Sequence, residues 1–436
     1  MDTGELPTRS LAAIWNPCTQ MKQHETLPLV AIARAKGAWI YDCDGKRYLD
    51  AISSWWVNLF GHCNPRVNAA LRDQLEKLEH VMLAGFTHEP VIELSERLIR
   101  LAPRGLGHCF YGSDGACSVE IALKMSFHFW HNSGQIRKTQ FLSVANGYHG
   151  ETLGALSVTD VAIFKNTYAP LLRSTATVPS PDWRRSEPGE YSLQYALRCS
   201  EILDSYLNKH HEDIAAFILE PLVQCAGGMA MYHPEYLKQA RQLCDRYAVH
   251  LIADEIAVGF GRTGTLFACQ QAGITPDLLC LSKSITGGYL PLSVVMCTDA
   301  IYRAFYDDEV GRGFLHSHSY SGNALACCAA NATLDIFEQD QVIQSNYAKS
   351  AQFTKMARII SQHPRVQDFR NTGMIWAFEV NNSDRNFSRN FHRAALESGL
   401  LLRPLGNTVY FMPPYIIDEE EMSFLVETTF ALLDKI

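Results

Sequence analysis

Between residues 107 and 297 the chain alternates short apolar runs with longer segments of helical periodicity. The apolar runs are GHCFYG, TQFLSVAN, IAAFILEPL, VHLIADEI, LLCLSK and PLSVVMC, and segments such as SVEIALKMSFHFWHN and HPEYLKQARQLCDRYA repeat apolar residues at helical spacing. Strands that alternate with helices favour a largely parallel sheet with both faces covered. The sequence therefore predicts an α/β fold, in which ligands bind at the carboxyl ends of the strands.

The two ends of the chain are organised differently from this central part. WIYDCDGKRYLDA has a DG turn between two β-rich runs, and NPRVNAALRDQLEKLEHVM and HEPVIELSERLIRLA have helical spacing. Towards the C-terminus the strands TGMIWAFEV and TVYFMPPYII flank the helix SRNFHRAALESG. We expect an N-terminal segment (1–60), a large domain (61–330) and a C-terminal domain (331–436).

Composition limits the class of protein. Of the 436 residues 47% are hydrophobic and the net charge is −8, which is typical of a globular enzyme and argues against a nucleic-acid surface. The 13 cysteines lie in apolar runs without metal-type spacing, as expected of free thiols in a reducing compartment. No secretory pattern and no membrane-length apolar run is visible. We therefore expect a cytoplasmic enzyme whose partners are small molecules.

Two residues at predicted strand ends carry the most specific chemistry. Asp254 follows the run HLIA, and Lys283 follows the next run, LLCLS. A lysine amine can form a Schiff base with an aldehyde on a pyridine ring, while a carboxylate pairs with the protonated ring nitrogen. This pair indicates pyridoxal phosphate (PLP) as the cofactor.

Three further positions are consistent with a cofactor site. In CFYGSDGACSVEIALKM a strand leads through a glycine turn into a helix, so Gly115 and Ala116 can offer backbone N–H groups to a phosphate, although a plain tight turn is the alternative. Asp114 would repel that phosphate unless its carboxylate points away. Tyr148 can stack on a flat ring or simply cover the core. Glu220 ends an apolar strand and can orient the pocket, cap a helix or form a salt bridge.

Other motifs are less specific. Gly259, Gly261 and Gly264 match GxGxxG, but Asp254 and Glu255 interrupt the apolar run before them, so we interpret the glycines as a turn. His316 and His318 form an HxH pair without a third ligand at a recognisable spacing, so no metal site is predicted.

Candidate substrate contacts come from the two ends of the chain. Arg403 follows an apolar strand and can bind a substrate carboxylate in bidentate fashion, with a surface salt bridge as the alternative. Adjacent tryptophans on an extended chain face opposite ways, so one of Trp55 and Trp56 is expected to line a pocket.

Together these residues resemble the fold-type I, PLP-dependent class III aminotransferases over nearly the whole chain. DEIAVGFGRTG, LSKSITGGYLPLS and HSHSYSGN are typical of that family. The resemblance implies a large domain with a mostly parallel seven-stranded sheet and a smaller α/β domain formed by the N- and C-terminal segments. It also implies PLP as cofactor and a homodimer with sites at the subunit interface.

The resemblance gives each candidate residue a role. Lys283 is the Schiff-base lysine, Asp254 pairs with the ring nitrogen and Tyr148 stacks on the ring. Gly115 and Ala116 hold the phosphate, helped by His318 and Ser319 of the partner subunit. The substrate-binding residues are Cys18, Trp55, Trp56, Tyr148, Ser317, Arg403 and Tyr410.

Within the family, IWNPCTQM, SSWWVNLFGHCNP, NGYHGET and LLRPLGNTVYFMPPYII are most similar to the enzymes of biotin biosynthesis that aminate 8-amino-7-oxononanoate with S-adenosylmethionine. Two positions depart from the family pattern. An aromatic residue is usual at Cys18, and a thiol cannot stack on an adenine, so lysine stays open as the donor. A serine is usual at Ala116, which can offer only its backbone N–H.

Two other functions remain as alternatives. Another class III ω-aminotransferase has the same core but does not require the Trp55–Trp56 pocket with Arg403. The second alternative is a non-catalytic PLP- or NAD-binding protein, against which the intact Lys283 argues.

Overall fold

The structure is a computed structural model that describes residues 5–435, and its contacts divide the chain into two compact units. The larger unit contains residues 66–351 and 370–376. The smaller unit combines the N-terminal residues up to Pro65 with residues 352–369 and 377–436.

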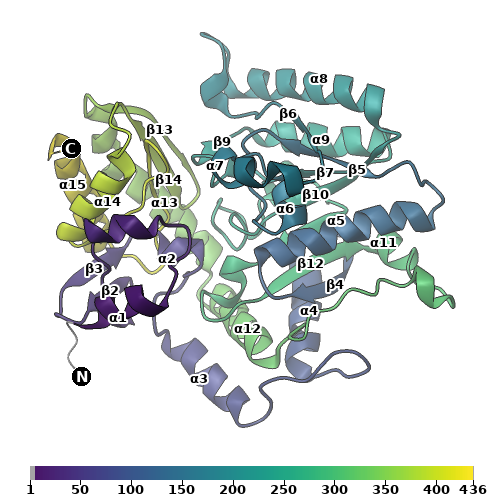
Figure 1. The fold of residues 1–436 in the computed structure, drawn as a ribbon, viewed down its shortest axis with the longest axis horizontal. Coiled ribbons are helices and arrows are strands. Elements are labelled where there is room, and N and C mark those ends of the chain that lie inside the picture. The colour runs from purple at the N-terminus through teal and green to yellow at the C-terminus, as the bar shows by residue number, and fades with distance from the viewer. Residues whose placement is uncertain (1–4, 436) are drawn as a thin grey trace. The chain divides into compact units, whose positions relative to one another are not determined.

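A seven-stranded sheet forms the centre of the larger unit (Figure 1). In spatial order its strands are β4 (Leu106–Gly112), β12 (Ser293–Thr298), β11 (Leu278–Leu281), β10 (His250–Asp254), β7 (Ile214–Leu219), β5 (Gln140–Val144) and β6 (Ala176–Val178). Only β12 runs antiparallel to its neighbours. The predicted α/β fold with a mostly parallel sheet is confirmed, and all six predicted strands belong to this sheet. The seventh, β6, has three residues, too few for a visible pattern.

Helices of this unit begin where the sequence supplies caps. The carboxylate of Asp114 accepts a hydrogen bond from Cys117 N at the start of α5 (Gly115–Asn132). His88 and His233 accept similar bonds at the starts of α4 (Glu89–Leu101) and α9 (Pro234–Arg246), each with a proline in the first turn. Such caps satisfy backbone N–H groups that have no partner within the helix.

The core of the larger unit lies between α5 and the sheet. Residues of α5, α6 (Leu153–Val158), β7, β10, β11 and β12 form one buried cluster, among them Val119, Ile121, Leu123, Val158, Ile218, Ile252, Leu278 and Val295. Residues Ile214–Leu219 of β7 are all buried, which explains why this strand is apolar along its whole length.

The remaining helices vary in length and burial. They are α1 (Leu6–Ala13), α3 (Pro65–Leu75), α7 (Ala162–Lys165), α8 (Ser192–His210), α10 (Cys269–Ala272), α11 (Asp299–Arg303), α12 (Ala324–Gln339), α13 (Val342–Ala357), α14 (Phe387–Glu397) and α15 (Glu419–Lys435). Short 3-10 segments are η2 (Met21–Glu25), η3 (Asn166–Leu171), η4 (Trp183–Arg185), η5 (Lys283–Thr286), η6 (Val310–Arg312) and η7 (Arg358–Gln362).

In the smaller unit, strands from both ends of the chain share one sheet, in the order β1 (Ile32–Lys36), β2 (Trp39–Asp42), β3 (Arg47–Asp50) and β15 (Leu400–Leu401). The DG turn between β2 and β3 is stabilised by the Asp42 carboxylate, which accepts bonds from Asp44 N and Lys46 N. Three more strands, β13 (Val366–Thr372), β14 (Ile375–Val380) and β16 (Thr408–Phe411), form a separate sheet. In the larger unit, β8 (Val223–Gln224) pairs with β9 (Ala230–Met231).

The segment labelled α2 (Ser53–Trp56) is a left-handed turn. The φ angles of Ser53, Ser54, Trp55 and Trp56 are 52°, 45°, 75° and 72°. Left-handed helical conformation costs L-residues about 1–2 kcal/mol each. The expectation that the two tryptophans lie on an extended chain is therefore wrong: Ser54 bonds the Asp50 carboxylate and Ser53 bonds the backbone of Met412.

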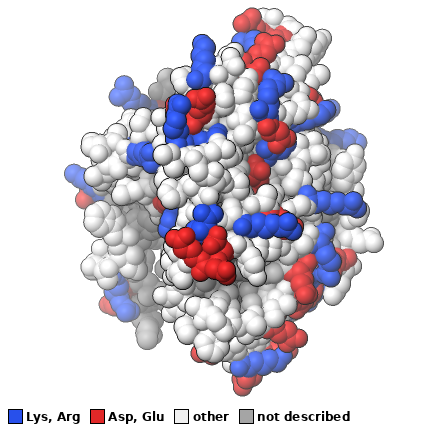
Figure 2. All heavy atoms as spheres, turned by 90° about the vertical axis from the view of Figure 1, so that its right-hand side faces the viewer, with Lys and Arg blue, Asp and Glu red and all other residues white. Residues whose placement is uncertain are grey.

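Charges are interspersed on the surface. Basic and acidic side chains lie close together on the face in Figure 2, without an extended area of one sign. Within residues 5–435 no helix is long and apolar enough to cross a membrane.

Because Phe217 in the middle of β7 is 0% exposed, Phe217→Ala should lower the free energy of unfolding by about 3–5 kcal/mol. Ile163, 84% exposed on α7, provides the control, and Ile163→Ala should stay within about 0.5 kcal/mol of wild type. Urea unfolding of the three proteins measures the difference. Equal losses in the two variants would contradict this description of the core.

Candidate active site

Asp254 and Lys283 lie at the carboxyl ends of adjacent parallel strands. Asp254 is the last residue of β10 and is in register with Cys280 of β11, and Lys283 begins η5 directly beyond β11. Burial lowers the pKa of the Lys283 amine, while nearby Cys225, Asp254 and Glu220 act in the opposite direction. The sheet thus brings the predicted lysine and carboxylate together at one edge.

The partner of Asp254 is His149, a residue to which the sequence assigned no role. His149 Nδ1 lies 2.7 Å from Asp254 Oδ2, and both side chains are almost fully buried. A carboxylate only accepts, so Nδ1 must carry the proton of this hydrogen bond. Asp254 Oδ1 accepts a second bond from Ile256 N, at 3.1 Å. These two bonds fix the orientation of the carboxylate.

Glu220 holds the loop that carries Tyr148. Its carboxylate accepts bonds from Tyr148 N at 2.9 Å and from Cys225 N at 3.0 Å. Burial raises the pKa of Glu220 to about 7; Asp254 adds to the increase, and His149 and the two backbone N–H groups oppose it. Both bonds go to backbone N–H groups of neighbouring loops, and the orienting role of Glu220 towards the cofactor stays a prediction.

The tyrosine ring itself is half-buried. Its hydroxyl donates to Glu151 Oε1 at 2.9 Å, and the ring meets Phe164 edge-on with centroids 5.4 Å apart.

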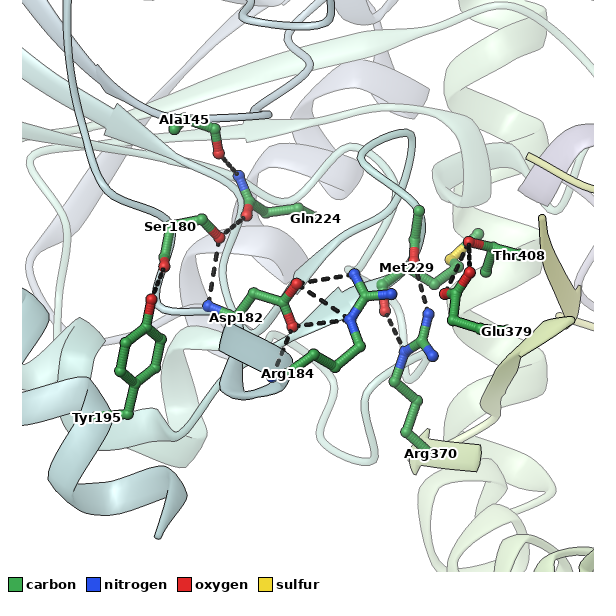
Figure 3. A network of polar contacts seen from close by, with 11 residues as sticks. Ala145, Ser180, Asp182, Arg184, Tyr195, Gln224, Met229, Arg370, Glu379 and Thr408 are labelled. Atoms are coloured by element: carbon green, nitrogen blue, oxygen red, sulfur yellow. Dashed lines mark hydrogen bonds and ion pairs between the residues drawn. The ribbon is translucent and has the colours of Figure 1, made fainter. Parts of the chain in front are cut away.

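A second set of contacts holds the backbone just before Tyr148. Figure 3 shows Gln224 between Ser180 and Ala145. Its amide Nε2 donates to Ala145 O at 3.0 Å, and its Oε1 accepts from the Ser180 hydroxyl. Ser180 and Gln224 are both buried, so this network fixes the start of the loop.

The glycine turn lies directly against these elements. A Cβ on Gly115 would come within 2.9 Å of Ile256, and one on Gly150 (φ 121°) within 2.7 Å of Ala116. Both glycines therefore permit a close approach that no other residue allows. Asp114 caps α5 through Cys117 N, so its carboxylate lies at the same helix N-terminus as the proposed phosphate donors, and the structure does not remove the repulsion expected from the sequence. Gly115 and Ala116 are the first residues of α5, where backbone N–H groups suit an anion.

The GxGxxG segment is a turn, as the sequence indicated. Glu255, fully buried, accepts bonds from Ala268 N at 2.6 Å and Cys269 N at 2.7 Å, which anchors the far side of the loop. Burial raises the pKa of Glu255 to about 7.

The HSHSYSGN segment lies beside the glycine turn of its own chain. His318 Nδ1 is 3.5 Å from Ser113 Oγ, and His316 Nδ1 is 2.8 Å from Lys124 Nζ. Ser317 and Ser319 are exposed. The roles predicted for these residues across a subunit interface stay predictions.

Of the seven predicted substrate residues, Tyr148 and Ser317 belong to the larger unit and the other five to the smaller unit. The Arg403 guanidinium lies over the Trp55 ring, 5.0 Å from its centroid, and its Nη2 donates to the backbone oxygen of Cys18 at 3.0 Å. Trp56 is 3% exposed, and its Nε1 donates to the hydroxyl of buried Tyr410 at 3.1 Å. The structure thus groups all five residues, with the ring of Trp55 on the outside, 41% exposed.

A model of the family Aminotransferase class-III matches residues 20–432. The chain therefore belongs to the class III aminotransferases, and the predicted membership and transaminase activity are confirmed. It is 47% identical to the adenosylmethionine-8-amino-7-oxononanoate aminotransferase of Helicobacter pylori, over 99% of this chain and 98% of that relative.

Two solved structures are also closely similar. The enzyme of the same name from Methanocaldococcus jannaschii has a TM-score of 0.94 at 34% identity and covers 100% of this chain and 99% of its own. An amine transaminase from an uncultivated Pseudomonas species, in the PLP-bound form, has a TM-score of 0.90 at 30% identity, with coverages of 97% and 98%. The family and this structure imply PLP, and the residues of the site fit it: an amine, an oriented carboxylate and a helix N-terminus lie at one sheet edge.

The buried carboxyl of Glu220 should make stability depend on pH. Its pKa is raised from 4.5 to about 7 on folding, so between these values the folded chain retains a proton that the unfolded chain has released. The free energy of unfolding therefore falls as pH rises through this window, by up to about 1.4 kcal/mol per pH unit for this group. Glu220→Gln should remove that part of the slope.

Urea unfolding at pH 5, 6 and 7 measures this slope. Glu420→Gln, at the exposed start of α15, is the control and should follow wild type. Parallel slopes for wild type and Glu220→Gln would contradict the raised pKa.

Proposed function

We propose that this enzyme binds PLP and transfers an amino group to 8-amino-7-oxononanoate, giving 7,8-diaminononanoate, with S-adenosylmethionine as the amino donor. The observation that carries the proposal is the placement of Lys283 beside the oriented carboxylate of Asp254. The specific substrates are supported by the name of the Helicobacter pylori relative, which aligns over nearly the full length of both chains.

Lys283 supplies the reactive amine. Burial lowers its pKa, which increases the fraction of neutral amine available to attack a carbonyl carbon and to accept a proton. The same Nζ would accept a proton from the substrate carbon and return it. PLP, when bound, acts as the electron sink for this proton transfer.

The other residues of the larger unit would hold and orient the cofactor. The Asp254 carboxylate, fixed by His149, pairs with a protonated ring nitrogen. Gly115 and Ala116 hold the phosphate through backbone N–H groups, and Tyr148 lies on the loop that Glu220 and Gln224 fix. These residues would hold the cofactor in one orientation, with its aldehyde within reach of Lys283.

Arg403 would provide the carboxylate contact for the substrate, with Trp55, Trp56 and Tyr410 of the same unit as further substrate residues; the substrate contact expected of Ser317 stays a prediction. A guanidinium presents five N–H donors, so the bond to Cys18 leaves capacity for a bidentate interaction. That bond uses the backbone oxygen of Cys18, so the replacement of an aromatic side chain at this position does not remove it.

We further propose a cytoplasmic homodimer in which His318 and Ser319 of the partner subunit contact the phosphate. The described cysteines are free thiols, which supports a reducing compartment. Ser317 and Ser319 are exposed on a loop of the chain, which supports a contact with a second copy.

The donor is tested by a half-reaction on the purified enzyme. S-adenosylmethionine alone should abolish the visible absorption band of the bound cofactor, and 8-amino-7-oxononanoate should restore it. Loss of the absorption band with lysine, but not with S-adenosylmethionine, would overturn the assignment of S-adenosylmethionine as the amino donor. Restoration by simple ketones but not by 8-amino-7-oxononanoate would favour an amine transaminase, the function named for the Pseudomonas neighbour.

Lys283→Ala should still bind PLP through the phosphate and ring contacts, but its multiple turnover should fall by at least about 10²–10⁴-fold, because it lacks the proton carrier. Lys209→Ala, exposed in the last turn of α8, is the control and should have wild-type turnover. Steady-state assays with both substrates measure the effect. Wild-type turnover by Lys283→Ala would contradict the role of the lysine.

A further inference from the structure

The left-handed turn at Ser53–Trp56 requires an explanation that its sequence does not provide. Four consecutive residues have positive φ, and none of them is glycine. L-residues adopt this conformation as single positions rather than as runs. Such a turn persists only when its surroundings over-determine it, and strain of this kind concentrates at functional sites.

A buried carboxylate holds the turn. Asp50 ends β3 and is 0% exposed. Its Oδ1 accepts a bond from Ser54 N at 2.8 Å, and its Oδ2 accepts from the Ser54 hydroxyl at 2.7 Å. His62 Nε2 lies 3.0 Å from the same Oδ2. Both oxygens of a desolvated carboxylate are thus used to hold the backbone and side chain of one residue, Ser54.

Further bonds fix both sides of the turn. The Ser53 hydroxyl donates to Met412 O at 2.7 Å, and Met412 N donates to Ala51 O at 2.9 Å. The backbone of His62 exchanges two hydrogen bonds with Gly37, at 2.8 and 3.1 Å. The turn is therefore anchored to β16 and to the β1–β2 connection.

The consequence of the turn is the direction of Trp55. Trp56 points inward to Tyr410, whereas Trp55 keeps its ring against the Arg403 guanidinium. An arginine stacked on an aromatic ring and bonded to Cys18 O has few other orientations. Its remaining donors therefore point in a fixed direction, which favours a planar, bidentate partner such as a carboxylate.

We propose that Asp50, His62 and Ser54 are positioning residues, and that the left-handed turn they hold sets the selectivity of the site for a substrate carboxylate by keeping Trp55 against Arg403. This inference deepens the proposed function and rests on its assignment of Arg403 to the substrate carboxylate.

Substitutions at Ser54 separate the backbone from the hydroxyl group. Ser54→Gly loses the hydroxyl but adopts positive φ without strain. Ser54→Ala loses the hydroxyl and keeps the strain, and Ser54→Thr keeps the hydroxyl but adds a β-branch that opposes positive φ. Ser423→Ala removes a hydroxyl that bonds Glu427 on α15 and is the matched control.

The measurement is the binding of nonanoate and of nonanamide to the full-length enzyme by calorimetry, which does not depend on turnover. Wild type and Ser423→Ala should prefer the carboxylate by about tenfold or more. Ser54→Ala and Ser54→Thr should lose most of that preference, and Ser54→Gly should keep it within about threefold. If Ser54→Ala does not fold, the comparison of Ser54→Thr with Ser54→Gly decides.

Three results would overturn the proposal: no carboxylate preference in wild type, an unchanged preference in Ser54→Ala and Ser54→Thr, or equal losses in Ser54→Gly and Ser54→Ala. The last would show that the hydroxyl bond, and not the backbone, matters. Failure of the proposed function is seen separately, as absence of turnover of 8-amino-7-oxononanoate by wild type.

Discussion

The hydrogen bond between His149 and Asp254 is the interaction on which the rest of the candidate site depends. Asp254 ends a strand in the middle of the sheet, where its carboxylate is removed from water and needs a donor. His149 provides that donor from a loop more than a hundred residues away in sequence. Gly150 of the same loop lies close against Ala116, so this loop contacts both Asp254 and the start of α5.

Around this site, buried carboxylates accept backbone hydrogen bonds that regular secondary structure would otherwise satisfy. Where strands end, backbone N–H groups lose their ladder partners and still require acceptors. Glu220 accepts hydrogen bonds from Tyr148 N and Cys225 N, and Glu255 accepts them from Ala268 N and Cys269 N, which follow the GxGxxG segment. Burial raises the pKa of both Glu220 and Glu255 to about 7, so the ordered loops come with a cost in stability near neutral pH.

The smaller unit uses the same device with a different result. Asp50 also ends a strand, is fully buried and binds the irregular backbone that follows it. Here the ordered segment is the left-handed turn of Ser54 and its neighbours, and the ordered side chain is Trp55. In both units a strand-end carboxylate converts an otherwise mobile loop into a defined surface, which suits sites that must present side chains in one orientation.

The sequence alone determined six strands of the central sheet and their alternation with helices, because apolar periodicity is a short-range property that each segment carries by itself. It also placed Lys283 and Asp254, since each directly follows a recognisable strand and the ends of parallel strands meet at one edge. The seventh strand, β6, was too short to give a pattern, and the structure alone revealed it.

Only the tertiary structure decided which distant groups pair and which strained conformations the fold supports. No local signal connects His149 with Asp254, because their spacing in sequence carries no information about their distance in space. Trp55 and Trp56 looked like an extended pair, since nothing in SSWW favours positive φ. Their left-handed turn is imposed by Asp50 and Met412 through contacts that exist only after folding, when the summed energy of packing exceeds the local preference of the chain.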